Sequence, residues 1–114
     1  MDIKNIIEST LNIPVRELSE PALQTGYATW YKSFVESELS GNGEVTEETE
    51  TYEIDIWGKG RQDVINKTSL LKKAIINIKY NTFPNVTFSY DTNGKMWRGN
   101  MNFKHMKEDI DGIS

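Results

Sequence analysis

Apolar residues near the start of the chain recur with helical spacing. They follow Asp2 at three- and four-residue steps, a pattern that predicts one apolar side of a helix: Ile3, Ile6, Ile7 and Leu11. Asp2 suits the N-cap, and Asn12-Ile13-Pro14 ends the pattern. Residues 14–25 hold two prolines and scattered polar groups, so we expect a connector there, with room for one turn of helix around Val15 to Leu18.

The next two segments have a period of two, which is typical of strands. Residues 27–35 are aromatic and β-branched on both parities, so we expect a strand covered on both faces by a helix or by another subunit. In residues 51–57, Tyr52, Ile54 and Ile56 alternate with Glu53 and Asp55, which predicts a half-buried strand with an acidic outer face. Residues 36–50 between them hold Ser-Gly-Asn-Gly and predict a long hairpin with a protruding acidic tip.

A second helix is predicted from about Arg61. It follows Gly58 and Gly60 and ends within the Asn-rich residues 77–81. Its apolar stripe consists of Val64, Leu71, Ile75 and Ile78. The three lysines of this helix, Lys67, Lys72 and Lys73, lie off that stripe and should face outward.

Asn93-Gly94 predicts a two-residue type I′ turn, because both central positions of that turn need positive φ. The turn would pair Tyr90 with Trp97, Phe88 with Gly99 and Val86 with Met101, all on one face. A register slip of one residue would bring polar residues into the core instead.

The predicted order is therefore helix, strand, strand, helix, strand, strand. Two β-hairpins around a helix indicate an α+β fold with a mainly antiparallel four-stranded sheet and helices on one face. The 114 residues suit a single domain, residues 1–114, with a hairpin at 36–50 that protrudes and a tail at 107–114 that frays. The absence of Cys suits a reducing cytoplasm, and no apolar run is long enough to predict a membrane span.

Charge is segregated along the chain although its net value is only −4. Residues 33–58 carry eight carboxylates and no base, whereas residues 59–107 carry ten bases and only Asp63 and Asp91 as acids. Two oppositely charged blocks can pair head to tail between copies, or can simply be a solvated acidic loop beside a lysine-bearing helix. The candidate protein-interface residues are Glu44, Glu47, Glu48, Glu50, Lys67, Lys72 and Lys73.

Catalytic chemistry is not indicated by any motif. His105 is the single histidine and has no nucleophile or carboxylate assigned to it, so we expect no catalytic, metal or cofactor site and no enzyme. Nucleic-acid binding by the basic second half is disfavoured, because Tyr90, Trp97 and Phe103 share the parity that packs the last hairpin and should be core.

Several segments together resemble the small tail-terminator or tail-completion (head-tail joining) proteins of long-tailed phages and prophages. The resemblance spans residues 20–107 and rests on Tyr-Ala-Thr-Trp-Tyr at 27–31, Tyr-Glu-Ile-Asp-Ile-Trp-Gly at 52–58, the helix from Arg61, and residues 95–103. It implies a structural subunit of a six-fold ring that caps the completed tail tube and joins it to the head connector. It also implies location in the virion tail, assembly in the host cytoplasm, DNA only in passage through the lumen, and no membrane.

A different class of function also fits the acidic hairpin. The chain would then be a small cytosolic module that docks a protein partner through residues 36–50. In a ring, the same hairpin would extend either toward the basic helix of the neighbouring subunit or into the central opening.

Overall fold

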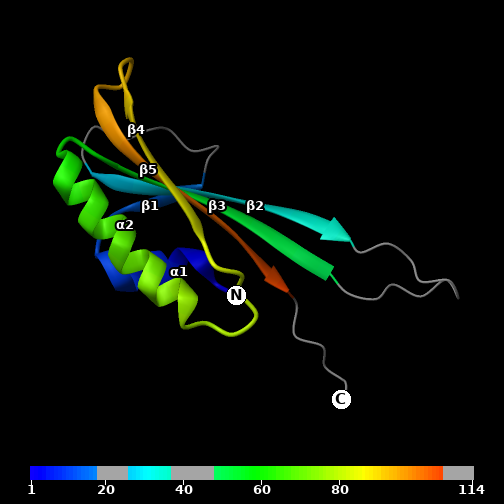
Figure 1. Cartoon of the computed structure of the whole chain (residues 1–114). Helices are drawn as coiled ribbons and strands as arrows, with labels where there is room; N and C mark the ends of the chain where they lie inside the picture. Colours follow the sequence, from blue (N-terminus) through cyan, green and yellow to red (C-terminus); the bar gives the residue numbers. More distant parts are fainter. Residues whose placement is uncertain (18–25, 37–47, 107–114) are drawn as a thin grey trace, which may run out of the picture.

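The computed structural model describes residues 1–17, 26–36 and 48–106. Within them lie the helices α1 (Ile3–Leu11) and α2 (Arg61–Ile76) and the strands β1 (Val15–Glu17), β2 (Tyr27–Glu36), β3 (Glu48–Gly58), β4 (Asn85–Asp91) and β5 (Met96–Met106). The strands form one sheet in the order β1-β2-β3-β5-β4, and both helices cover the same face of it (Figure 1). The α+β class is the one predicted from the sequence.

The described residues form a sheet of five strands, so the predicted number of four is wrong; the sheet is mainly antiparallel, as predicted, with one parallel pair. The additional strand is β1, which runs parallel to β2 and pairs Val15 with Ala28. It occupies the connector in which a helical turn was expected. Pro14 cannot donate a backbone hydrogen bond, but its carbonyl accepts one from Ala28 N at 2.9 Å, and Val15 is buried in the core. Burial of a β-branched residue against β2 favours the extended backbone over a helical turn.

Helix α1 matches its prediction closely. The Asp2 carboxylate accepts a hydrogen bond from Asn5 N at 3.2 Å, which satisfies one of the free N–H groups of the first turn. Ile3, Ile7 and Leu11 are buried, and the helix ends at Asn12, whose φ of 53° is left-handed.

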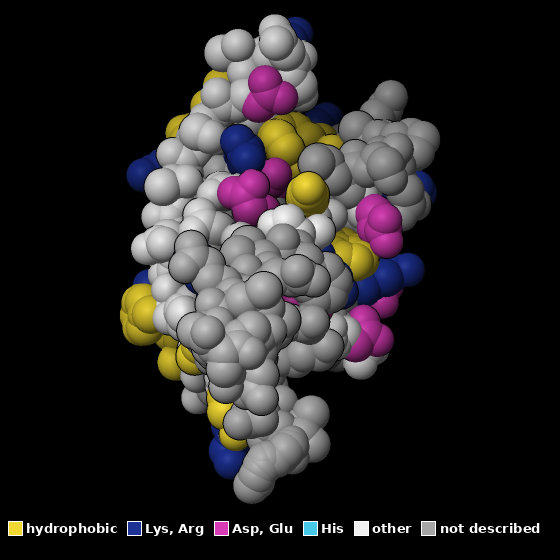
Figure 2. Space-filling view, turned by 90° about the vertical axis from the view of Figure 1, so that its right-hand side faces the viewer, with side chains coloured by type: hydrophobic (Ala, Val, Ile, Leu, Met, Phe, Trp, Pro, Cys, Tyr) yellow, Lys and Arg dark blue, Asp and Glu magenta, His cyan; other side chains and the backbone are white. Residues whose placement is uncertain are grey.

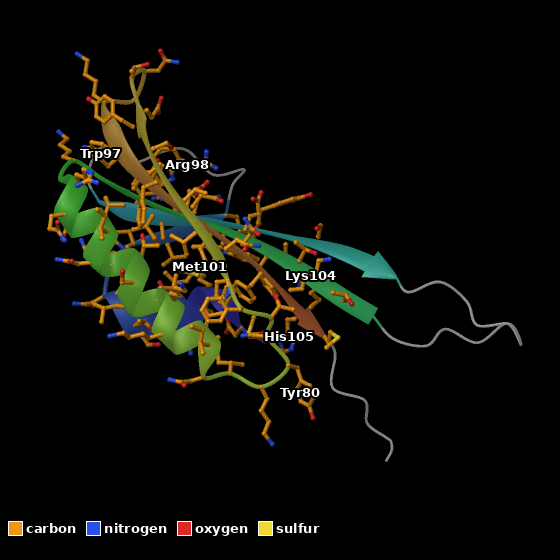
Figure 3. The ribbon with its side chains drawn as sticks, in the orientation of Figure 1. Tyr80, Trp97, Arg98, Met101, Lys104 and His105 are labelled. Atoms are coloured by element: carbon orange, nitrogen blue, oxygen red, sulfur yellow. The ribbon has the colours of Figure 1, made fainter. Side chains whose placement is uncertain are left out.

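Helix α2 packs on β3 and β5 through Val64, Thr68, Leu71 and Ile75, all of which are buried. The sheet side of this core contains Tyr52, Ile54, Ile56, Met101 and Phe103. Figure 3 shows Met101 near the middle of β5, with α2 running alongside. The alternating apolar residues of β3 therefore lie on the helix-covered face of the sheet, as predicted.

The register of the β4–β5 hairpin is the one predicted, with Tyr90 opposite Trp97 and Phe88 opposite Gly99. The turn type is not. Neither Asn93 nor Gly94 has a positive φ; the left-handed residue is Lys95, with φ of 55°. The carboxylate of Asp91 accepts hydrogen bonds from the backbone N–H groups of both turn residues at 3.2 Å, and these bonds favour a wider four-residue loop over type I′.

The two strands of the predicted acidic hairpin are confirmed, whereas its tip is not described. Strands β2 and β3 pair antiparallel as far as Glu36 opposite Glu48. Residues 37–47, which include the predicted tip, and the predicted frayed tail at 107–114 lie outside the described residues. Their behaviour stays a prediction.

Candidate interaction surfaces

Oppositely charged segments that are separate in the sequence lie side by side in the sheet. The acid-rich strand β3 lies between β2 and β5, and two of its carboxylates pair with a base from one neighbour each. Lys32 Nζ lies 3.3 Å from Glu50 Oε2, and Arg98 Nε lies 2.8 Å from Asp55 Oδ1. On the face drawn in Figure 2, acidic and basic side chains lie next to one another rather than in separate patches. Part of the linear charge segregation is therefore neutralised by ion pairs within the chain.

Glu50 is the clearest example, because it is only 8% exposed. It shares the parity of Tyr52 and Ile54, which places it on the helix-covered face of β3. The Tyr52 hydroxyl donates to Glu50 Oε1 at 3.1 Å. Burial on its own raises the pKa of Glu50, but the hydrogen bond from Tyr52 and the Lys32 ammonium outweigh it, so the pKa lies below its ordinary value of 4.5. The carboxylate is thus engaged within the chain, and the interface role predicted for it stays a prediction.

The same carboxylate and its surroundings affect the tyrosine. Burial raises the pKa of Tyr52, and the hydrogen bond to the Glu50 carboxylate raises it further. The phenol therefore stays protonated at any physiological pH and remains a donor to Glu50.

The other predicted interface residues fall into three groups. Lys67 is engaged within α2, where its Nζ lies 2.9 Å from Asp63 Oδ2. Lys72 lies over the Phe83 ring, 4.6 Å from its centroid, and Lys73 is exposed. Glu48 begins β3, and Glu44 and Glu47 lie outside the described residues. Lys67, Lys72 and Lys73 all lie on α2, and none of them forms an ion pair with Glu50 within the described residues.

The sheet face opposite the helices carries a polar network centred on Asp55. Arg98 donates to both carboxylate oxygens of Asp55, from Nε at 2.8 Å and from Nη2 at 3.2 Å, and Asn100 Nδ2 donates at 2.8 Å. The hydrogen bond with Asp55 raises the pKa of Arg98. Such a bidentate pair is geometrically specific and orders β3 against β5. The periodicity of the strands does not predict this pair, although Asp55 and Arg98 each lie at outward-facing positions of predicted strands.

His105 links the end of β5 to the loop after α2. Its Nδ1 lies 2.6 Å from Asn81 Oδ1, while Asn81 Nδ2 donates to Ile75 O at 3.1 Å. Burial lowers the pKa of His105, although Glu50 opposes the effect. Because Asn81 Nδ2 donates to Ile75 O, Asn81 Oδ1 is the atom that can accept from the Nδ1–H of His105, and this contact connects the end of β5 to the loop after α2. Among the described residues, no cluster of His, Asp or Glu side chains has the arrangement of a metal site.

A groove runs between α2 and the edge strand β4. Its volume is about 230 Å³, and it is lined by Thr68, Ser69, Lys72, Val86 and Phe88. We call this feature the α2/β4 groove. Three aromatic side chains near it are exposed, Phe83 by 68%, Phe88 by 40% and Tyr90 by 47%. Exposure of Tyr90 corrects the expectation that it is core; the expectation holds for Phe103, which is buried and stacks on Tyr52.

Tyr90 is exposed because β4 is an edge strand, with a neighbour on one side only. Its ring meets Trp97 edge to face with centroids 5.3 Å apart, and Arg61 lies 5.6 Å from the Trp97 centroid. Trp97 lies on β5 near the start of α2 (Figure 3). Parity along the strand correctly predicted which face these rings share but could not show that α2 leaves part of that face open.

None of the described helices is both long enough and apolar enough to cross a membrane.

Comparison with known proteins gives a fold and no family. No protein-family model matches the chain, and no curated protein matches its sequence. The structure is similar to a chain in the solved virion of a native gene transfer agent (GTA) particle, with a TM-score of 0.61 at 10% sequence identity. The similarity covers 88% of this chain and 82% of that chain. At this identity the finding establishes a shared fold over most of both chains.

Proposed function

We propose that this protein is a structural component of a virion, and that it acts as a tail-terminator-like subunit. In this role, copies form a closed ring that caps the tail tube and joins it to the head connector, and the chain performs no catalysis. The observation that carries the proposal is the fold shared with a chain of the GTA virion over most of both chains. A fold alone does not specify a function, so the resemblance of residues 20–107 to tail-terminator proteins supplies the finer assignment.

The distribution of exposed features supports a ring. A ring requires two different surfaces on each subunit, because its contacts are heterologous and close on themselves. This chain offers the α2/β4 groove on one edge of the sheet and the acid-rich β2–β3 hairpin on the other side of β5. Lys72 lines the groove, whereas residues 36–50 are rich in acids in the sequence, and opposite charges favour contacts between unlike surfaces over contacts between like ones.

The proposal is tested first by assembly. The purified protein is examined by size-exclusion chromatography with light scattering and by negative-stain electron microscopy, and closed rings are expected. The tail-tube protein of the same phage or prophage is then polymerised with and without the protein. We expect the protein to bind tube ends and to stop their elongation.

A chain that stays monomeric at high concentration and leaves tube elongation unchanged would contradict the proposal. If such a monomer instead bound another partner, and lost that binding when the acids of residues 36–50 were neutralised, the docking-module alternative would replace it.

A further inference from the structure

The α2/β4 groove combines apolar and cationic groups. Lys72 lines it and lies over the Phe83 ring, and Arg61 lies over Trp97 farther along the same side of α2. Within the described parts of the chain, neither cation forms an ion pair, because the ion pairs there involve Lys32, Lys67 and Arg98. Each cation therefore contacts an aromatic ring, and neither is neutralised by a carboxylate of the described residues. A ligand with carboxylates and some apolar surface matches this arrangement.

Strand β4 borders the groove with an unpaired edge. The described strands place a neighbour, β5, on only one side of it. Its sequence, Asn-Val-Thr-Phe-Ser-Tyr-Asp, contains no Lys or Pro, the residues that commonly protect an exposed edge against further pairing. The outward N–H and C=O groups of such an edge can accept an extended segment as an additional strand.

We propose that the α2/β4 groove and the edge of β4 bind residues 38–47 of a second copy of this chain. This inference rests on the proposed ring and names its contact. The segment 38–47 carries Glu38, Glu44 and Glu47, contains no Lys or Arg, and includes Leu39 and Val45 as apolar residues. Its charge thus complements Arg61 and Lys72, and its apolar residues match Val86 and Phe88. Along the chain the segment follows β2 and precedes β3, and β5 lies between β3 and β4 in the sheet, so the contact joins two different surfaces and can close a ring.

Charge reversal tests the contact with a matched control on the same helix. Lys72→Glu places a carboxylate in the groove, whereas Lys73→Glu makes the same change at an exposed position that does not line it. At about 0.1 M salt, where the Debye length is about 10 Å, we expect Lys72→Glu to raise the dissociation constant of the assembly at least about tenfold. Lys73→Glu should change it by less than about twofold. Circular dichroism and the melting temperature confirm that both variants are folded.

The reciprocal variant makes the test specific for the occupant. Glu44→Lys with Glu47→Lys should weaken assembly when purified alone, because the segment then meets like charges in the groove. Mixing this variant with Lys72→Glu should restore assembly, since every contact between unlike copies again joins opposite charges. Combining all three changes in one chain should restore it as well.

Three results would overturn the inference. The first is an equal effect of Lys72→Glu and Lys73→Glu, and the second is a failure of the mixture to recover assembly. The third is weakened binding of duplex DNA by Lys72→Glu without any change in assembly, which would indicate a nucleic-acid surface. If wild-type rings cap tubes and are insensitive to these variants, only the inference fails; a wild-type protein without rings or tube binding removes the proposed function itself.

Discussion

The position of a residue along a strand decides whether its side chain lies on the covered or the exposed face of the sheet. Glu50 illustrates the rule: it belongs to an acidic run, yet its position two residues before Tyr52 directs it to the covered face of β3. A buried carboxylate is stable there only because Tyr52 donates to it and Lys32 lies 3.3 Å away. The alternation visible in residues 50–56 could have predicted its burial; the identity of its partners could not be predicted, because Lys32 comes from another strand.

Glu50→Gln should therefore lower stability in a pH-dependent way. The folded protein holds the pKa of Glu50 below 4.5, so the carboxylate stabilises the fold above that pH and loses this effect as pH falls through the folded value. Urea denaturation should show a loss of about 1–2 kcal/mol at pH 7. The difference from wild type should disappear below the folded pKa, where Glu50 is itself protonated. Glu53→Gln, at an exposed position of the same strand, serves as control; an equal pH dependence in that variant would contradict the assignment.

Lys95 is a second residue whose backbone depends on its surroundings. Its φ of 55° is unfavourable for a side chain with a Cβ, whereas Gly94 beside it has no positive φ. Lys95→Gly should then stabilise the protein by about 0.5–1 kcal/mol, since relief of strain exceeds the additional freedom of the unfolded chain. Thermal or chemical denaturation measures the change. Destabilisation by Lys95→Gly would favour the type I′ turn that the Asn93-Gly94 dipeptide predicts.

At the level of elements, the close packing of α2 on the sheet depends on Gly99. A Cβ at this position would meet Thr68 Oγ1, the Phe88 ring at 3.2 Å and Val64 Cγ1 at 3.2 Å. Thr68 is buried at this contact, and its hydroxyl is satisfied by donating to Val64 O at 2.7 Å. The bare backbone of β5 at Gly99 thus allows a helix and an edge-strand aromatic to pack at the same point.

Gly99→Ala should push α2 away from β5 and destabilise the fold by about 1–3 kcal/mol. The double variant with Thr68→Ala should recover part of the loss, because it removes the atom nearest to the new Cβ. Gly26→Ala is the control, since its Cβ would meet only Trp57 O at 3.6 Å and Lys67 Nζ at 3.9 Å, which are ordinary contact distances. Urea denaturation curves decide the outcome, and a Gly99→Ala protein as stable as wild type would show that the contact is loosely packed.

In the molecule as a whole, some charged side chains form ion pairs within the sheet and others contact only aromatic rings. Glu50 and Asp55 are paired within the chain, whereas Arg61 and Lys72 lie over aromatic rings without an ion pair in the described parts. The acids of residues 38–47 are the complementary set in the sequence. Ion pairs within a packed sheet are screened by salt much less than contacts between exposed charged surfaces.

Assembly should therefore respond to salt more than folding does. Raising the ionic strength from about 0.1 M to about 1 M shortens the Debye length from about 10 Å to about 3 Å and should dissociate the proposed rings into folded monomers. Light scattering reports the mass, and circular dichroism at the same salt concentrations reports the fold. Rings that strengthen at high salt would instead place the acidic segments in the central opening, where they repel one another.

Local patterns in the sequence by themselves determined both helices, strands β2 and β3, the register of the β4–β5 hairpin and the α+β class. Each of these depends on contacts or periodicities within a few residues, such as the Asp2 cap or the alternation from Tyr52 to Ile56. Only the tertiary structure decided the rest: the pairing of β1 with β2, the engagement of Glu50 by Lys32, and the exposure of Phe88 and Tyr90 beside α2. These features join segments distant in sequence, and their free energy comes from burial and charge pairing that no local window contains.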